Sequence, residues 1–123
     1  MGITNLTKEN FDKTIEQNDI VFIDCWASWC EACKDFGPVF EKVSEMKGNI
    51  TFAKIDTMKE KELIKSLNVE HIPTLLLFRD NIMLFKQAGY FEESKLLDIL
   101  DQAQSLDMDM VRADIEEQKN DEN

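Results

Sequence analysis

Three strand-length runs of this sequence are apolar on both alternating faces, and they limit the fold more than any other feature. These runs are residues 20–27, 50–55 and 74–78. A strand with two apolar faces is typical of the centre of a sheet that helices cover on both sides. The runs therefore predict an α/β fold, within which the acidic residue Asp24 is an anomaly.

Segments with helical spacing separate these strands. The expected helices cover residues 7–17, 31–48, 58–67 and 94–104, with Thr7 and Ser94 as N-caps. Residues 74–78 and 82–87 are expected to form a hairpin through the turn Asp80-Asn81. With a short first strand at residues 3–5, the predicted element order is βαβαβαββα.

The length of the chain fits one domain with an appendage. Its 123 residues, 43% of them hydrophobic, can bury a core without a disulfide framework. We expect a compact domain over residues 1–105 and an acidic C-terminal extension over 106–123, partly helical or disordered. From Asp107 onward there are seven acidic and two basic residues, and the polar stretch 116–123 is expected to be disordered.

Charge and hydropathy argue against two classes of partner. The 25 acidic and 14 basic residues give a net charge of −11, which repels phosphate backbones and anionic lipid headgroups. The apolar runs are much shorter than the roughly 20 residues that span a bilayer. Since the N-terminus has neither a basic start nor an apolar segment, we expect a soluble, cytoplasmic protein.

The three cysteines, Cys25, Cys30 and Cys33, lie within nine residues, which suits chemistry better than a spread disulfide framework. Cys30 and Cys33 are three residues apart where a strand gives way to a helix. At a helix N-terminus, unpaired N–H groups and the dipole stabilise a thiolate on the first cysteine. The second thiol, one turn in, can displace a mixed disulfide. A zinc site is the weaker alternative, because the remaining candidate ligands are Cys25 and the single histidine, His71.

Several motifs in order resemble the thioredoxin family. They are residues 23–34 with the Cys-Glu-Ala-Cys segment, Lys54-Ile55-Asp56, residues 72–78 with Ile72-Pro73, and Gly89. The resemblance covers about residues 1–105. It implies a thioredoxin fold, with a mixed sheet of four or five strands, helices on both faces and a cis-proline loop beside the CxxC segment.

The resemblance also implies roles for individual residues. Cys30 would be the exposed nucleophile and Cys33 the buried resolving thiol. The Ile72-Pro73 peptide would be cis, and the backbone of Ile72 would pair with an extended substrate. An apolar substrate groove would be lined by Trp29, Ile72, Ala88 and Gly89.

Asp24 matches the buried carboxylate of the family, which exchanges a proton with the resolving thiol, and Lys54 matches the lysine near that carboxylate. Burial in an apolar strand raises the pKa of a carboxyl group, which agrees with such a role. The alternative is a carboxylate that nearby donors merely satisfy. Cys25, on the opposite strand face, is expected to fill the core, and His71 either touches the substrate rim or has no role.

Glu31-Ala32 is the main departure from the family, which typically has Gly-Pro between the cysteines. These two positions tune the redox potential. Because Glu31 adds negative charge at the helix N-terminus, we expect Cys30 to be less acidic than in a Gly-Pro relative.

The sequence therefore predicts a thiol:disulfide oxidoreductase that reduces protein disulfides through Cys30 and Cys33. The expected redox group is this disulfide alone, without a metal or organic cofactor. The expected partners are protein disulfides and a thioredoxin-reductase-like electron donor, and the chain is expected to be a monomer. The alternatives are a thioredoxin-fold binding module, or a disulfide isomerase or oxidase if the protein is exported.

Overall fold

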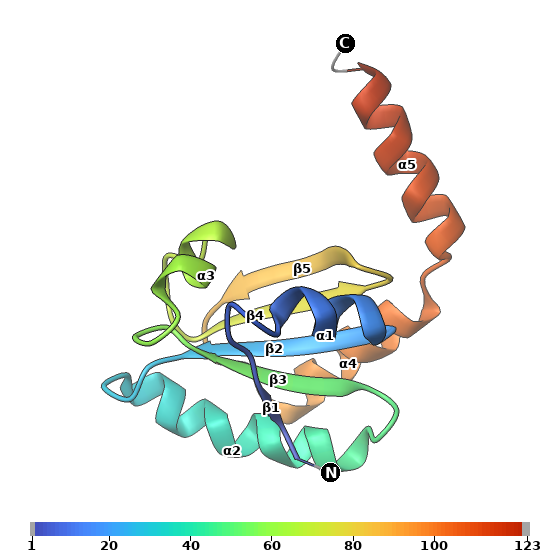
Figure 1. The fold of residues 1–123 in the computed structure, drawn as a ribbon. Coiled ribbons are helices and arrows are strands. Elements are labelled where there is room, and N and C mark those ends of the chain that lie inside the picture. The colour runs from blue at the N-terminus through green and yellow to red at the C-terminus, as the bar shows by residue number, and fades with distance from the viewer. Residues whose placement is uncertain (1, 122–123) are drawn as a thin grey trace.

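The computed structural model describes residues 2–121, and its core is a five-stranded mixed sheet (Figure 1). In chain order the elements are β1 (Thr4–Asn5), α1 (Phe11–Gln17), β2 (Ile20–Trp26), α2 (Glu31–Met46), β3 (Thr51–Asp56), α3 (Lys61–Ser66), β4 (Thr74–Arg79), β5 (Ile82–Ala88), α4 (Glu93–Ser105) and α5 (Met108–Asp121). The expected order is confirmed, with α5 as an additional helix.

The strand order across the sheet is β1-β3-β2-β4-β5. The strands β1, β3 and β2 pair in parallel, whereas β4 is antiparallel to both β2 and β5. The central strand β2 is buried over six of its seven residues, as its apolar sequence predicts. The hairpin turn is confirmed at Asp80 and Asn81, whose positive φ angles of 53° and 66° suit a tight hairpin connection.

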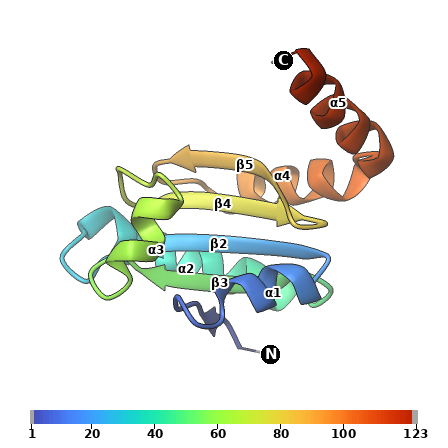
Figure 2. The same cartoon turned by 45° about the horizontal axis from the view of Figure 1, so that its top comes forward.

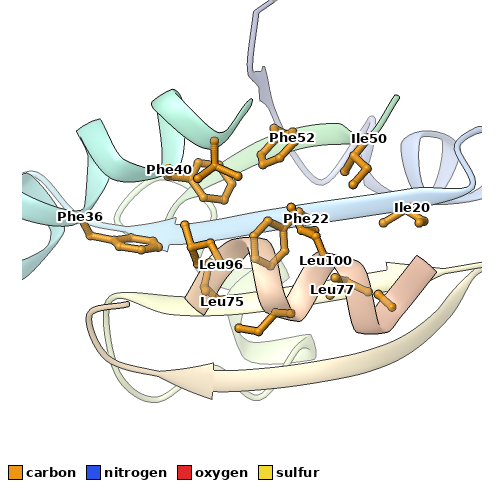
Figure 3. Close-up of a cluster of buried hydrophobic side chains, with 13 residues drawn as sticks. Ile20, Phe22, Phe36, Phe40, Ile50, Phe52, Leu75, Leu77, Leu96 and Leu100 are labelled. Atoms are coloured by element: carbon orange, nitrogen blue, oxygen red, sulfur yellow. The ribbon is translucent and has the colours of Figure 1, made fainter. Parts of the chain in front are cut away.

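Helices cover both faces of the sheet (Figures 1 and 2). The helices α2 and α4 lie on one face and enclose the larger core cluster, whose centre is Phe22 of β2 (Figure 3). The ring of Phe22 lies 5.6 Å from that of Phe40 and 5.8 Å from that of Phe52. On the opposite face, α1 and α3 cover a second cluster that includes Ile23 and Cys25.

Three helices begin at residues other than those expected. The Thr7 N–H group donates to the Asn10 side chain and the Asn10 N–H group to the Thr7 hydroxyl, so this pair closes a separate turn before α1. A turn before α3 is closed in a similar way, with the Met58 N–H group donating to Asp56. The N-cap of α4 is Glu92, not Ser94.

The helix α5 projects away from the sheet, at the end opposite the loop between β2 and α2 (Figures 1 and 2). Its first residue, Met108, is buried, and Arg112 forms an ion pair of 3.0 Å with Asp80. Arg79 donates to the carbonyl oxygens of Ala103 at 2.7 Å and Leu106 at 2.9 Å, which fixes the link between α4 and α5. Residues 116–121 are helical, so the expectation of disorder is wrong for them; residues 122–123 lie outside the described part of the chain.

Within residues 2–121, no helix has both the length and the apolar character needed to cross a bilayer.

Candidate active site

The two spaced cysteines meet at the start of α2. Cys30 is the N-cap residue with extended backbone, and its Sγ accepts a hydrogen bond of 3.2 Å from the Cys33 N–H group. The two residues form a disulfide, with their Cα atoms 5.2 Å apart. The sulfur of Cys30 therefore lies where helix N–H groups stabilise negative charge.

The exposure of the two cysteines differs from expectation. Cys33 is 6% exposed, as the prediction of a buried resolving thiol requires, but Cys30 is also only 6% exposed, so the prediction of an exposed Cys30 is wrong for the disulfide form. The physical reason is that both pack in one apolar cluster with Ala27, Trp26 and Ile72. The two thiols still differ in chemical environment, because Cys30 Sγ lies at the helix N-terminus and accepts a hydrogen bond from the Cys33 N–H group.

The second segment of the site is the loop before β4, where the Ile72–Pro73 peptide bond is cis. Pro73 is buried, and its carbonyl oxygen accepts a hydrogen bond of 2.8 Å from the Gly89 N–H group. This bond joins the loop to the end of β5, next to Ala88. Gly89 has a φ of 120°, which favours glycine over residues that carry a Cβ.

Two large exposed side chains lie next to these segments. Trp29, directly before Cys30, is 64% exposed. Tyr90, directly after Gly89, is also exposed, and its ring packs 5.9 Å from that of Phe36 in α2. The sequence analysis missed Tyr90, although an aromatic residue beside a predicted glycine bend was the available signal.

Asp24 is 1% exposed on β2, on the sheet face that α2 covers. Burial raises its pKa to about 7, and the nearby charge of Lys54 opposes part of that increase. Among the described residues, its Oδ1 has no hydrogen-bond partner, so the alternative of a carboxylate satisfied by nearby donors does not describe this oxygen. Lys54 is the register partner of Asp24 on β3.

The third cysteine is separate from this site. Cys25 lies in the core cluster on the opposite face, as expected, and burial raises the pKa of its thiol to about 12. His71 is exposed. Across residues 2–121, no group of three or more His, Cys, Asp or Glu side chains is arranged to hold a metal ion.

Comparison with known proteins agrees with this geometry. The family model described as Thioredoxin matches residues 2–102. This chain belongs to the thioredoxin family. A Streptomyces coelicolor protein that has thioredoxin 2 as its provisional name is 46% identical over 114 residues, which cover 93% of this chain and 85% of that protein. The thioredoxin of Mycoplasmoides gallisepticum is 35% identical over 98 residues, which cover 80% of this chain and 96% of the relative.

Solved thioredoxin structures have the same fold. A mutant thioredoxin from Halobacterium salinarum superposes with a TM-score of 0.78 at 28% identity, over 85% of this chain and 92% of that one. The thioredoxin of Plasmodium falciparum gives a TM-score of 0.76 at 26% identity, over 81% of this chain and 98% of that one. The expected thioredoxin fold is confirmed.

Family membership and the paired cysteines together identify the activity. The protein is a thiol:disulfide oxidoreductase, with a Cys30–Cys33 pair at disulfide distance. The paired cysteines lie at the start of α2, and Ile72 of the loop before β4 packs against them.

Proposed function

We propose that the protein reduces disulfides in other proteins, with Cys30 as the nucleophile and Cys33 as the resolving thiol. The observation that carries this assignment is the hydrogen bond from the Cys33 N–H group to Cys30 Sγ at the N-terminus of α2. That environment favours the thiolate form of Cys30 over that of Cys33.

The reaction balances as two thiol exchanges. The Cys30 thiolate attacks one sulfur of the substrate disulfide, a mixed disulfide forms, and the other substrate sulfur leaves as a thiolate. Cys33 then loses its proton and attacks Cys30 Sγ, which releases the second substrate thiolate. The substrate gains two electrons, and the Cys30–Cys33 pair is left as a disulfide.

Asp24 is the proposed acceptor of the Cys33 proton. A base that exchanges protons during turnover works best when its pKa is near the ambient pH, and burial raises the pKa of Asp24 to about 7. Lys54 is the proposed tuning residue beside it, because its positive charge opposes the increase.

The proposed docking surface consists of Trp29, Ile72, Ala88 and Gly89. The exposed indole of Trp29 offers apolar area beside Cys30, and the cis Ile72–Pro73 segment presents backbone to an extended chain. Pro73 is the proposed packing residue that borders the disulfide.

Glu31 and Ala32 are the proposed tuning residues between the cysteines. The side chain of Glu31 is exposed and forms an ion pair of 3.2 Å with Lys34. Its negative charge still lies at the helix end that holds Cys30 Sγ, and it disfavours a second negative charge there.

The proposed organisation is a catalytic domain over residues 1–105 and a separate extension over 106–123. The active-site loop and α5 lie at opposite ends of the molecule, which supports this division (Figure 2). We propose a monomeric, cytoplasmic protein that binds neither nucleic acid nor membranes. Its Cys30–Cys33 disulfide would be its only redox group, and a thioredoxin-reductase-like donor would reduce it again after each turnover. A single reactive pair with a buried third thiol suits a reducing compartment.

The proposed roles of the two cysteines are tested by trapping. Cys33→Ser should accumulate a mixed disulfide between Cys30 and a protein disulfide such as insulin, visible on a non-reducing gel. Cys30→Ser, the matched control, should accumulate none. If Cys30→Ser traps substrate and Cys33→Ser does not, the assignment is reversed; if neither variant traps and the wild type does not reduce insulin, the proposed function is wrong.

A further inference from the structure

An ion pair next to the active site is not explained by the proposed roles above. Lys54 Nζ lies 3.5 Å from Oε1 of Glu41 on α2. The same nitrogen lies 3.8 Å from the point that a Cβ on Gly37 would occupy. Because Gly37 and Glu41 are four residues apart, they share one face of α2, and the ammonium group lies against that face.

Asp24 is the other acidic group that could pair with Lys54. The two residues are register partners on neighbouring strands, and the charge of Lys54 acts on Asp24. Among the described residues, however, the ion pair of Lys54 is with Glu41, and Asp24 Oδ1 has no hydrogen-bond partner. A buried acid thus lies beside a cation that pairs with a different carboxylate.

We propose that Glu41 is a positioning residue for disulfide exchange, which holds the Lys54 ammonium group against α2 and away from Asp24. This inference rests on the proposed role of Asp24 as the proton acceptor for Cys33. Glu41 acts in two ways, and both raise the pKa of Asp24. It keeps the Lys54 charge from Asp24, and its own negative charge disfavours ionisation of Asp24.

The surroundings of Asp24 leave few competing sources for such an effect. On its own strand and on β3 the titratable or charged groups are Cys25, Lys54 and Asp56. The helix α2, which packs against this side, carries the buried Cys33 and the exposed residues Glu31, Lys34, Asp35, Glu41, Lys42 and Glu45. The partner of Asp24 on β4 is the apolar Leu75, and α1 packs on the opposite face of β2. Lys34 and Lys42 have exposed side chains that pair with Glu31 and Glu93, whereas the side chain of Lys54 is only 19% exposed and its charge acts on Asp24.

The first test is the titration of Asp24 in the full-length, oxidised Glu41→Gln variant, followed by NMR of the side-chain carboxyl carbon at low salt. The pKa of Asp24 should fall by about 0.5, a modest change because Glu41 is 61% exposed and partly screened by solvent. An unchanged pKa would overturn the inference. A higher pKa would also overturn it, since Glu41 would then be holding Lys54 towards Asp24.

Glu45→Gln is the matched control. Glu45 is exposed one turn further along α2 and has no ion-pair partner among the described residues. This variant removes the same charge from the same helix, so the pKa of Asp24 should stay at its wild-type value. A decrease equal to that in Glu41→Gln would show a general field effect and would overturn the specific role of Glu41.

The Lys54→Gln variant tests whether Glu41 affects Asp24 through Lys54 or by direct charge repulsion. Without the ammonium group, the Glu41→Gln substitution should change the pKa of Asp24 by less than half as much as it does in the wild-type background. An equal change in both backgrounds would refute positioning. The titration requires no turnover, so these outcomes are distinct from a failure of the proposed reductase function.

The kinetic readout is the pH profile of mixed-disulfide resolution in single-turnover reduction of a peptide disulfide. In Glu41→Gln, the acid limb should move to lower pH by the same amount as the pKa of Asp24. A merely structural role would lower the rate at every pH without moving the limb, and that result would overturn the inference.

Discussion

Replacement of Asp24 by Asn should stabilise the fold at neutral and alkaline pH and have little effect in acid. The carboxyl group is buried, and burial raises its pKa from 3.8 to about 7. The folded state therefore binds this proton more tightly than the unfolded state does. With respect to this group, the free energy of unfolding is highest below pH 4, where Asp24 is protonated, and it decreases as the pH rises from 4 to 7.

The size of the effect follows from the pKa difference. At about 1.4 kcal/mol for each tenfold change in acidity, an increase from 3.8 to about 7 costs the wild type about 4 kcal/mol above pH 7. At pH 4 the same relation gives only about 0.5 kcal/mol. Asn has a similar shape and no charge, so Asp24→Asn should avoid this pH-dependent loss.

The assay is guanidinium unfolding of the oxidised protein, followed by tryptophan fluorescence from pH 4 to pH 9. The difference in unfolding free energy between Asp24→Asn and the wild type should grow by about 4 kcal/mol across this range. The exposed-site variant Glu45→Gln should show no such trend. A difference that stays constant with pH would refute the claim that Asp24 is held as a neutral acid at low pH and ionised at a cost above pH 7.

Three further predictions concern other parts of the molecule. In the native, reduced protein at pH 8, iodoacetamide should leave Cys25 unlabelled, because burial raises the pKa of its thiol to about 12, whereas in guanidinium it should label all three thiols. Labelling of Cys25 in the native state would contradict its burial. Glu31→Gln should lower the midpoint pH of the Cys30 alkylation rate, since it removes negative charge at the helix N-terminus. An unchanged or higher midpoint would exclude this reasoning. Deletion of residues 106–123 should leave insulin reduction within about twofold of the full chain, because the active site lies at the other end of the molecule (Figure 1); a tenfold loss with the fold intact would give the extension a role in turnover.

Much of the fold could be predicted because the sequence pattern is local. Two-sided apolar runs identify β2 and β4 as buried strands, and Asp80-Asn81 identifies the hairpin turn. Helix starts were less predictable, because side chains such as Thr7 and Asn10 close turns of their own before a helix begins. The last turns of α5 were missed because the polar composition of residues 116–121 suggested disorder.

The parts of the site that depend on residues close together in the sequence could be predicted, whereas the parts that depend on tertiary contacts could not. The spacing of Cys30 and Cys33 placed both at the start of a helix, and Asp24 was conspicuous within an apolar strand. Nothing in the sequence indicates that Glu41 pairs with Lys54, because these residues meet only when α2 packs on β3. The equal exposure of the two cysteines is likewise a property of the packed disulfide.

The central claim is that Cys30 and Cys33 form a reversible redox pair that reduces protein disulfides. Its most direct test is the equilibrium reduction potential of the full-length protein in thiol:disulfide buffers, with Cys30→Ser as the control that lacks the pair. We expect a two-electron couple near that of thioredoxin, about −270 mV. A value of about −180 to −120 mV would contradict the reductase and indicate an isomerase or oxidase. The absence of any reversible couple would leave a binding module in place of the enzyme.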